Sequence, residues 1–257
     1  MITLTSDFGL KDPYVAEMKG AILTINPKAT IIDITHDVQK FNIRMGAFML
    51  ASAAPYFPKG TVHLAVVDPG VGTDRGAILV QTKQCFLVGP DNGVLMLAAQ
   101  NMEIEHTYEL ANPKFMLLEV SSTFHGRDIF APATAYLDMG MKPEEFGPEL
   151  TNVVTPEFAS LKSSNGTLTG EVLHVDGFGN IITNISRKEI AQAKTVNVKL
   201  QKFSLKLSLG KTYAQTKPQE AVALIGSHGF LEIALNRGSA AEKFQIAAED
   251  NIEVTPS

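Results

Sequence analysis

Short apolar strand patterns alternate with helical patterns through the first 155 residues of this 257-residue chain. Strands are predicted at 2–5, 30–34, 61–67, 77–81, 85–88, 103–108 and 115–120. Between them, apolar residues recur at helical spacing from Val15 to Ile25, and helices are also expected over 43–53 and 128–139. Strand–helix–strand repetition predicts an α/β domain with a mostly parallel sheet covered by helices.

The texture changes at the polar stretch 156–166, which ends in Ser163-Ser164-Asn165-Gly166, a turn or linker signal. Beyond it only 188–193 looks helical, and Gly or Asn stands in most gaps between strand patterns. These strands are expected at 167–175, 180–185, 195–200, 204–209, 221–225, 230–234 and 244–248. We therefore predict an α/β domain over 1–155, a linker over 156–166 and an all-β, barrel-like domain over 167–257.

Charge and cysteine content exclude several classes of protein. Lys plus Arg number 22 against 27 Asp plus Glu, and no basic cluster of the kind that binds nucleic acid is present. The single cysteine, Cys85, excludes an internal disulfide and a multi-thiolate zinc or iron–sulfur site. The longest uncharged run, 45–58, is too short to span a bilayer, and the first residues lack a signal-peptide pattern. We expect a cytoplasmic protein that binds neither nucleic acid nor membrane.

Acidic residues follow four of the predicted strands at the same relative position: Asp7, Asp37, Asp68 and Asp91. In open α/β sheets, ligands gather beyond the carboxyl ends of the strands. Each acid alone also has a simpler interpretation, because Asp stabilises turns through its own backbone. The repetition is what indicates a polar site.

Two loops of the first domain carry the strongest chemical signals. The loop from Asp68 to Arg75 contains two glycines and a proline, and it can bring a carboxylate and a guanidinium toward one small polar ligand. The alternative is an ion pair that only ties the loop down. In the segment 121–128, His125 is a candidate proton carrier because its ordinary pKa is near 6.5, and Asp128 is expected to cap the following helix.

No phosphate-loop, dinucleotide-glycine or zinc-ligand pattern is present. Scattered Asp and His residues leave open an oxygen-rich divalent-metal site. In the second half, Asp176-Gly177-Phe178-Gly179-Asn180 can bind a small polar ligand through its carboxylate, amide and ring, or can be a glycine-rich hairpin. Ser227 and His228 lie in a comparable connection, and Tyr213 lies in a loop before the next strand.

Seven short stretches, spread in order over both halves, resemble the S-adenosyl-L-methionine (SAM) hydroxide adenosyltransferase family. These are SAM hydrolases related to fluorinating and chlorinating enzymes. The matching stretches are LTSDFG at 4–9, ITH at 34–36, VDPGVG at 67–72, GPDNG at 89–93, TFHGRD at 123–128, DGFGN at 176–180 and GSHG at 226–229.

The resemblance implies an α/β domain followed by a barrel-like domain, in a homotrimer whose sites combine one chain's N-terminal domain with a neighbour's C-terminal domain. It implies cleavage of SAM by water into adenosine and methionine, with no cofactor and no metal. The catalytic residues it implies are Asp68, Arg75 and His125. The substrate-binding residues it implies are Asp7, Phe124, Asp176, Phe178, Asn180, Tyr213 and Ser227. Halogenating relatives have an arginine where this chain has His228.

The implied catalytic set favours water over halide as the nucleophile, because an ionised Asp68 would repel a halide. We expect Asp68 to orient water, Arg75 to stabilise developing hydroxide and His125 to help carry the proton away. The alternatives are an adenosine- or SAM-binding protein without turnover, a halide-using SAM transferase, and a divalent-metal hydrolase built on Asp7, Asp37 and Asp68.

Overall fold

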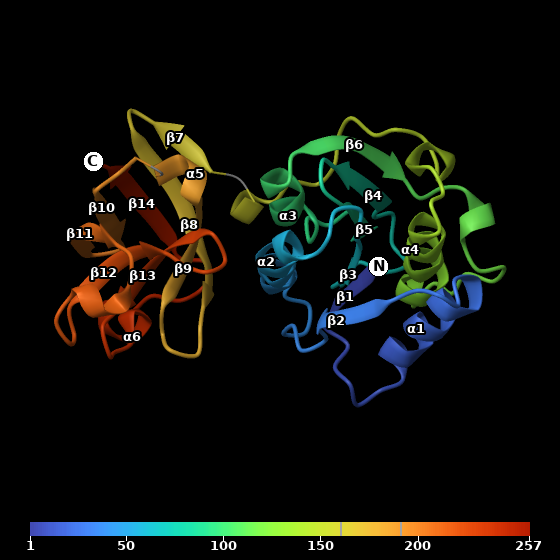
Figure 1. The fold of residues 1–257 in the computed structure, drawn as a ribbon, viewed down its shortest axis with the longest axis horizontal. Coiled ribbons are helices and arrows are strands. Elements are labelled where there is room, and N and C mark those ends of the chain that lie inside the picture. Colours follow the sequence, from blue (N-terminus) through green and yellow to red (C-terminus); the bar gives the residue numbers. More distant parts are fainter. Residues whose placement is uncertain (160, 191) are drawn as a thin grey trace. The chain divides into compact units, whose positions relative to one another are not determined.

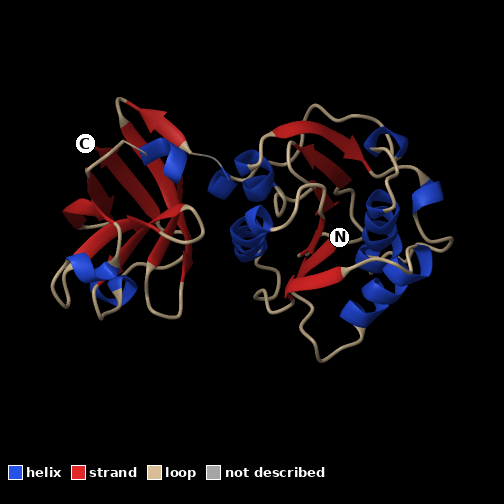
Figure 2. Ribbon diagram, in the orientation of Figure 1, coloured by secondary structure: helices blue, strands red, loops and turns tan. Residues whose placement is uncertain are grey.

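A computed structural model describes residues 1–159, 161–190 and 192–257 (Figure 1). The chain forms two compact units, Met1–Pro156 and Glu157–Ser257. The first contains both strands and helices, whereas the second is built mostly of strands (Figure 2). Each helix of the described residues is too short or too polar to span a lipid bilayer.

A six-stranded sheet forms the centre of the first unit. Its strands are β1 (Ile2–Ser6), β2 (Ile31–Thr35), β3 (Val62–Val66), β4 (Ala77–Thr82), β5 (Phe86–Pro90) and β6 (Ile104–Glu109). They lie in the order β2-β1-β3-β5-β4-β6. The pairs β2–β1, β1–β3 and β3–β5 are parallel, and β4 runs antiparallel to both of its neighbours. The predicted mostly parallel sheet is confirmed.

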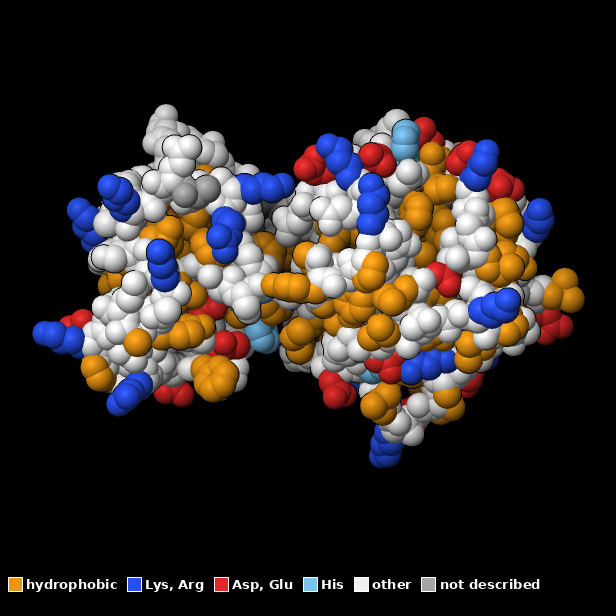
Figure 3. Space-filling model, in the orientation of Figure 1, with side chains coloured by type: hydrophobic (Ala, Val, Ile, Leu, Met, Phe, Trp, Pro, Cys, Tyr) orange, Lys and Arg blue, Asp and Glu red, His pale blue; other side chains and the backbone are white. Residues whose placement is uncertain are grey.

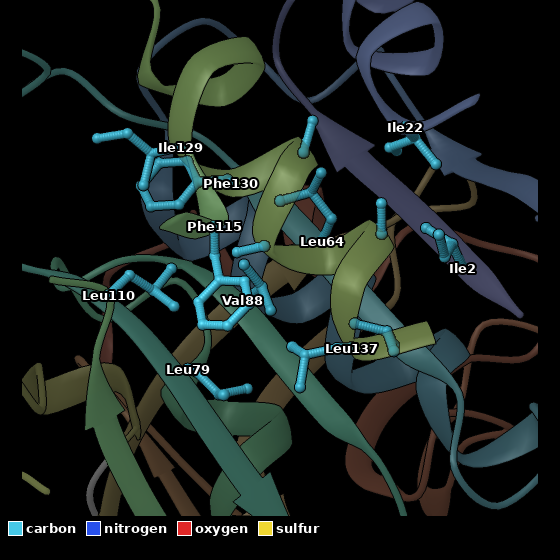
Figure 4. Packing of buried hydrophobic residues seen from close by; sticks show 14 of the residues in the cluster. Ile2, Ile22, Leu64, Leu79, Val88, Leu110, Phe115, Ile129, Phe130 and Leu137 are labelled. Atoms are coloured by element: carbon cyan, nitrogen blue, oxygen red, sulfur yellow. The ribbon is translucent and has the colours of Figure 1, made fainter. Parts of the chain in front are cut away.

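Helices cover both faces of this sheet. Helices α1 (Tyr14–Ile25) and α4 (Ala131–Asp138) pack together on one face, and α2 (Ile43–Ala53) and α3 (Met96–Asn101) on the other (Figure 1). Strands β1 and β3 are consequently buried along their whole length. Figure 4 shows sheet residues such as Leu64 and Val88 among the buried side chains of the core, with Phe115, Phe130 and Leu137.

The second unit is a closed β-barrel of seven strands. They are β8 (Thr167–Val175), β9 (Ile181–Ser186), β10 (Thr195–Leu200), β11 (Phe203–Gly210), β12 (Ala221–Ile225), β13 (Phe230–Leu235) and β14 (Asn251–Pro256). The order β14-β10-β11-β12-β13-β9-β8 closes through a β14–β8 pairing. All neighbours are antiparallel except β11 and β12. The short helices α5 (Arg187–Ile190) and α6 (Ala240–Phe244) join strands. The predicted barrel-like domain is confirmed.

The segment 156–166, predicted as a linker, contains a β-strand that belongs to the second unit. Strand β7 (Lys162–Ser164) pairs with the start of β8. Asn165 and Gly166 form the two-residue turn between them, with φ of 51° and 77°. Positive φ at both positions is what a tight hairpin needs, and Asn-Gly supplies it at low cost.

Two predicted strands are wrong. Over 115–120 the chain instead leaves a short turn at Phe115, and the backbone N–H of Leu117 donates to the carbonyl of Asp128 at 2.9 Å. Over 244–248, Phe244 is instead the last residue of helix α6. Ser239 caps the start of this helix, because its hydroxyl accepts from the backbone N–H of Glu242. Only Phe115 in the first stretch, and Phe244 and Ile246 in the second, are buried, whereas Leu118 and Val120 are exposed. The strand pattern could not distinguish these backbone conformations.

Charges of both signs are mixed on the surface. On the face that Figure 3 shows, basic and acidic side chains of the described residues alternate with apolar ones. This mixture differs from the single-sign stripe by which proteins hold a nucleic-acid backbone.

Candidate active site

The first candidate site lies where the order of the sheet reverses direction. The chain leaves β1, crosses through α1 to β2 on one side, and then crosses through α2 to β3 on the other side. The carboxyl ends of β1 and β3 therefore border the switch point, where open α/β folds bind ligands. A cavity of about 410 Å³ lies there, and Phe8 after β1 and Asp68 after β3 both line it.

Asp68, Arg75 and His125 form one connected set. Arg75 Nε donates to both carboxylate oxygens of Asp68, at 3.0 Å each, and Nη2 makes a further charged contact with Oδ2. The same Nη2 lies 2.9 Å from Nδ1 of His125. The side chains of Arg75 and Asp68 are only 10% and 5% exposed, and the guanidinium lies over the ring of Phe130. The ion pair that the sequence offered as the alternative interpretation of this loop is therefore present, and its carboxylate also lines the cavity.

The contact with Arg75 defines the protonation of His125. A guanidinium can only donate, so Nδ1 is the acceptor and the ring proton lies on Nε2. Burial lowers the pKa of His125 below its ordinary value, and the nearby charge of Arg75 lowers it further against the smaller opposing effects of Asp68 and Asp128. The imidazole is thus held in its uncharged form beside the cavity.

A close backbone approach holds the two loops of the set together. A Cβ atom placed on Gly72, whose φ is +78°, would lie 2.2 Å from the carbonyl oxygen of Ser122. Only glycine permits this distance and this backbone conformation. Gly72 therefore lets the loop that carries Asp68 and Arg75 lie against the loop that carries His125.

The prediction that Asp128 caps the following helix is wrong. Its side chain is fully buried and accepts from the backbone N–H of Ser121 at 2.8 Å. It also binds the guanidinium of Arg127, which reaches Glu17 on α1 at 2.8 Å. The segment begins with a π-helical turn, Gly126–Phe130, so the carboxylate points back into the loop. Asp128 thus fixes the segment on which His125 stands.

Aromatic rings form one wall of this cavity. Phe8, Tyr14 and Phe124 pack edge to face or tilted, with centroids 5.3 to 5.7 Å apart. Asp7 precedes Phe8 and is nearly buried, and its Oδ2 accepts from the backbone N–H of Phe41 at 2.8 Å. Sequence reasoning had singled out Asp7 and Phe124 but had missed Tyr14, because an isolated tyrosine at a helix start carries no motif.

The other predicted strand-end acids have structural contacts. The carboxylate of Asp91 accepts from the backbone N–H of Val154 at 2.8 Å, which ties down the end of the first unit. The backbone N–H of Asp37 donates to the hydroxyl of Thr35 in a local turn. Among the described residues, no group of three or more His, Cys, Asp or Glu could hold a metal ion, so Asp7, Asp37 and Asp68 do not form a ready-made metal site.

A second cavity, of about 700 Å³, lies in the barrel unit. Its lining includes all five residues predicted there, namely Asp176, Phe178, Asn180, Tyr213 and Ser227. Asp176 organises the turn before β9, because its Oδ1 accepts from the backbone N–H groups of Phe178 and Asn180 at 2.9 Å. The Asn180 amide donates to its Oδ2. Phe178 is 83% exposed, so its ring is available for stacking.

Sequence reasoning missed Glu232 in this cavity. It lies on β13 and is only 3% exposed, yet it lines the cavity and accepts from the Tyr213 hydroxyl at 2.8 Å. Burial and the hydrogen bond to Glu232 raise the pKa of Tyr213 to about 12, so the phenol keeps its proton. The signal that could have found Glu232 is a single charge inside the apolar strand 230–235.

The fold and the two cavities define a class of small-ligand enzyme: an α/β unit with an Asp–Arg–His set at its switch point, followed by a barrel with a polar and aromatic cavity. The chain belongs to the SAM hydroxide adenosyltransferase family. Signatures of the family's N-terminal and C-terminal domains match residues 2–147 and 170–253.

Individual relatives agree with this assignment. The chain is 37% identical to an (R)-S-adenosyl-L-methionine hydrolase of Methanocaldococcus jannaschii, covering 99% of this chain and 95% of the relative. A fluorinase of Actinoplanes sp. is 27% identical over 99% of this chain and 97% of its own length. A crystal structure of an uncharacterized conserved protein from Thermotoga maritima superposes with a TM-score of 0.85, at 39% identity and 99% coverage of both chains.

Proposed function

We propose that this protein hydrolyses SAM to adenosine and methionine by attack of water on the ribose 5′ carbon. The observation that carries the proposal is the connected set of Asp68, Arg75 and His125 beside a cavity at the switch point of the sheet. Relatives of this chain are named as SAM hydrolases, and the family's two domain signatures match both units. No cofactor is part of the proposal, because SAM itself supplies the leaving group.

The chemistry follows from the charges of the set. The oxygen of water forms a bond to the 5′ carbon while the carbon–sulfur bond breaks, and its electron pair leaves with the thioether of methionine. A sulfonium needs no protonation to leave, so the demanding part is water, whose pKa is about 15.7. Asp68 orients the water, and Arg75 stabilises the charge that develops on its oxygen. Positioning for in-line attack supplies much of the rate.

One proton must leave the attacking water. His125 passes it to solvent in this proposal, and the atom that accepts it is Nδ1, since Nε2 already carries a proton. Acceptance therefore requires the contact between Nδ1 and Arg75 to open during turnover. The lowered pKa of His125 keeps the ring uncharged and able to accept.

The same set disfavours halide as the nucleophile. A halide must be stripped of water and held by uncharged donors, whereas here a carboxylate lines the cavity. The fluorinase relative is also less similar, at 27% against 37% identity. Hydrolysis is thus favoured over halogenation.

We further propose that the protein acts in the cytoplasm as a homotrimer, with each complete site formed from the first unit of one chain and the barrel unit of a neighbour. In this arrangement Asp7 and Phe124 contact the nucleoside from one chain, and the barrel residues contact it from the other. Light scattering at several protein concentrations tests the trimer, and cell fractionation tests the location. A monomer that retains full activity would contradict the shared site.

The activity itself is tested by incubating the pure protein with each sulfonium epimer of SAM and measuring adenosine by chromatography. Both epimers are needed because the hydrolase relatives are named for the (R) form. Asp68→Ala is the matched control, because it removes the carboxylate of the set. The proposal fails if the wild-type protein forms no more adenosine from either epimer than this variant does.

Two alternatives have distinct outcomes in the same experiment. A binding protein without turnover would bind adenosine tightly in calorimetry while forming no product. A divalent-metal hydrolase would lose activity in chelator and recover it when one metal is added back. The hydrolase proposed here keeps its activity in chelator.

A further inference from the structure

The barrel cavity contains a buried carboxylate whose hydrogen-bond partners are a tyrosine and a histidine. The side chain of Glu232 is 4% exposed. Its Oε1 accepts from the Tyr213 hydroxyl at 2.8 Å, and its Oε2 lies 3.2 Å from Nε2 of His228. Both oxygens accept, which is the pattern of an ionised carboxylate, and neither partner is Lys or Arg.

The hydrogen bonds of His228 direct its ring toward Glu232. Its Nδ1 accepts from the backbone N–H of Phe230 at 3.3 Å, so its ring proton lies on Nε2 and points to Glu232. The ring stacks on Phe230, and the side chain is 11% exposed. Both nitrogens are therefore engaged within the protein. His228 does not supply the cation that an arginine at this position would offer to a substrate carboxylate.

The charges that line the cavity are predominantly negative. Asp176 and Glu232 line it together with one cation, the exposed Arg237. The Asp176 carboxylate likewise accepts hydrogen bonds from uncharged groups, namely the backbone of Phe178 and the backbone and amide of Asn180. A buried carboxylate with only uncharged partners is costly, and a positively charged ligand reduces that cost.

We propose that the barrel cavity selects its ligand by positive charge, with Glu232 as the specificity-determining anion, and that it does not select for the substrate's carboxylate. This inference rests on the proposed function, in which the ligand is a 5′-sulfonium nucleoside. The substrate class is therefore 5′-sulfonium nucleosides with or without the amino-acid carboxylate, and neutral thioether nucleosides are excluded.

The first experiment compares kcat/KM for SAM and for decarboxylated SAM, which keeps the sulfonium and the amine. We expect the two values to agree within about threefold, or decarboxylated SAM to be faster. A carboxylate held by a charged hydrogen bond contributes roughly ten- to hundredfold. A preference for SAM of tenfold or more therefore overturns the proposal. If Arg237→Gln abolishes that preference, Arg237 is the residue that recognises the carboxylate.

The second experiment measures binding and needs no turnover. Calorimetry in the Asp68→Ala background compares SAM with S-adenosylhomocysteine, whose sulfur is uncharged. We expect SAM to bind at least tenfold more tightly, and Glu232→Gln to reduce this preference to less than about threefold. Tyr213→Phe is the matched control, because it removes a hydrogen bond to Glu232 and retains the charge, so the preference should persist.

The outcomes separate this inference from the proposed function. Equal weakening of both ligands in Glu232→Gln would show a structural role only and would overturn the proposal. If Glu232→Gln does not fold, the comparison of SAM with S-adenosylhomocysteine in the Asp68→Ala protein still tests the proposal. Equal binding of the two ligands there would overturn it. If neither sulfonium yields adenosine, the proposed hydrolysis fails, while the binding comparison still tests selection by charge.

Discussion

Arg75 donates from Nη2 to Nδ1 of His125 across 2.9 Å, so this contact occupies the ring nitrogen that can accept a proton. The guanidinium at the same time holds the carboxylate of Asp68 through Nε and Nη2. Arg75 is therefore the residue on which the geometry of the whole set depends.

Arg75→Lys should lower kcat by roughly 100- to 1000-fold, although the charge is retained. A lysine ammonium is a point charge and cannot bridge the carboxylate and the imidazole as the planar guanidinium does. Adenosine formation at saturating SAM measures the effect, and a thermal melt checks that the variant is folded. A kcat within tenfold of the wild type would show that positive charge alone is sufficient.

Gly72→Ala should reduce activity by about 100-fold, because a displacement of about 1 Å between reacting groups has that effect. The added Cβ would meet the carbonyl of Ser122 at 2.2 Å and push the two loops apart. Gly60→Ala is the matched control, since Gly60 also has positive φ, +84°, but has no atom within 4 Å of an added Cβ. Equal losses in both variants would mean that backbone strain, rather than loop spacing, matters.

The pH profile of kcat/KM should have an acidic limb with a midpoint below 6.5. The pKa of His125 is lowered by burial and by Arg75, so the ring stays uncharged, and able to accept a proton, to lower pH than a free histidine. Nuclear magnetic resonance titration of the ring assigns the limb. In Arg75→Gln the titration should move upward, toward 6.5, because one of the two lowering effects is removed. A His125 midpoint at or above 6.5 in the wild type contradicts this prediction.

His63 should make the fold less stable in acid. It is fully buried on β3, and burial lowers its pKa from 6.5 to about 4. Below pH 6.5 the unfolded chain takes up a proton that the folded chain does not, so the free energy of unfolding falls as the pH falls from 6.5 to 4. The loss is about 3 kcal/mol.

Urea unfolding at several pH values tests the effect of His63. His63→Gln is the control, because glutamine does not titrate but can still share a hydrogen bond with Thr3, whose hydroxyl lies 2.7 Å from His63 Nδ1. Between pH 4 and 6.5, the free energy of unfolding of the variant should depend on pH less steeply, by the uptake of about one proton. The same pH dependence in both proteins would assign the effect to other groups.

Local sequence patterns predicted most of the fold. The runs at 2–5 and 61–67 correspond to the buried strands β1 and β3, because a strand covered on both faces requires mostly small or apolar side chains. The same reasoning failed at 115–120 and 244–248, where Phe115 and Phe244 are buried from a turn and a helix while Leu118 is fully exposed. A short apolar run shows neither which backbone conformation the chain adopts nor that each of its positions is buried.

The sequence by itself determined the two kinds of fold and the residue types of the site, since strand periodicity, glycine turns and acids at strand ends are local properties. It also offered an ion pair between Asp68 and Arg75 as one of two interpretations of their shared loop, and that pair is present. Only the tertiary structure decided that Arg75 reaches His125, fifty residues away, and that Asp128 supports the loop instead of capping a helix. It alone placed Glu232 in the barrel cavity. Contacts between distant segments depend on how the strands are ordered and packed, and no local pattern encodes that order.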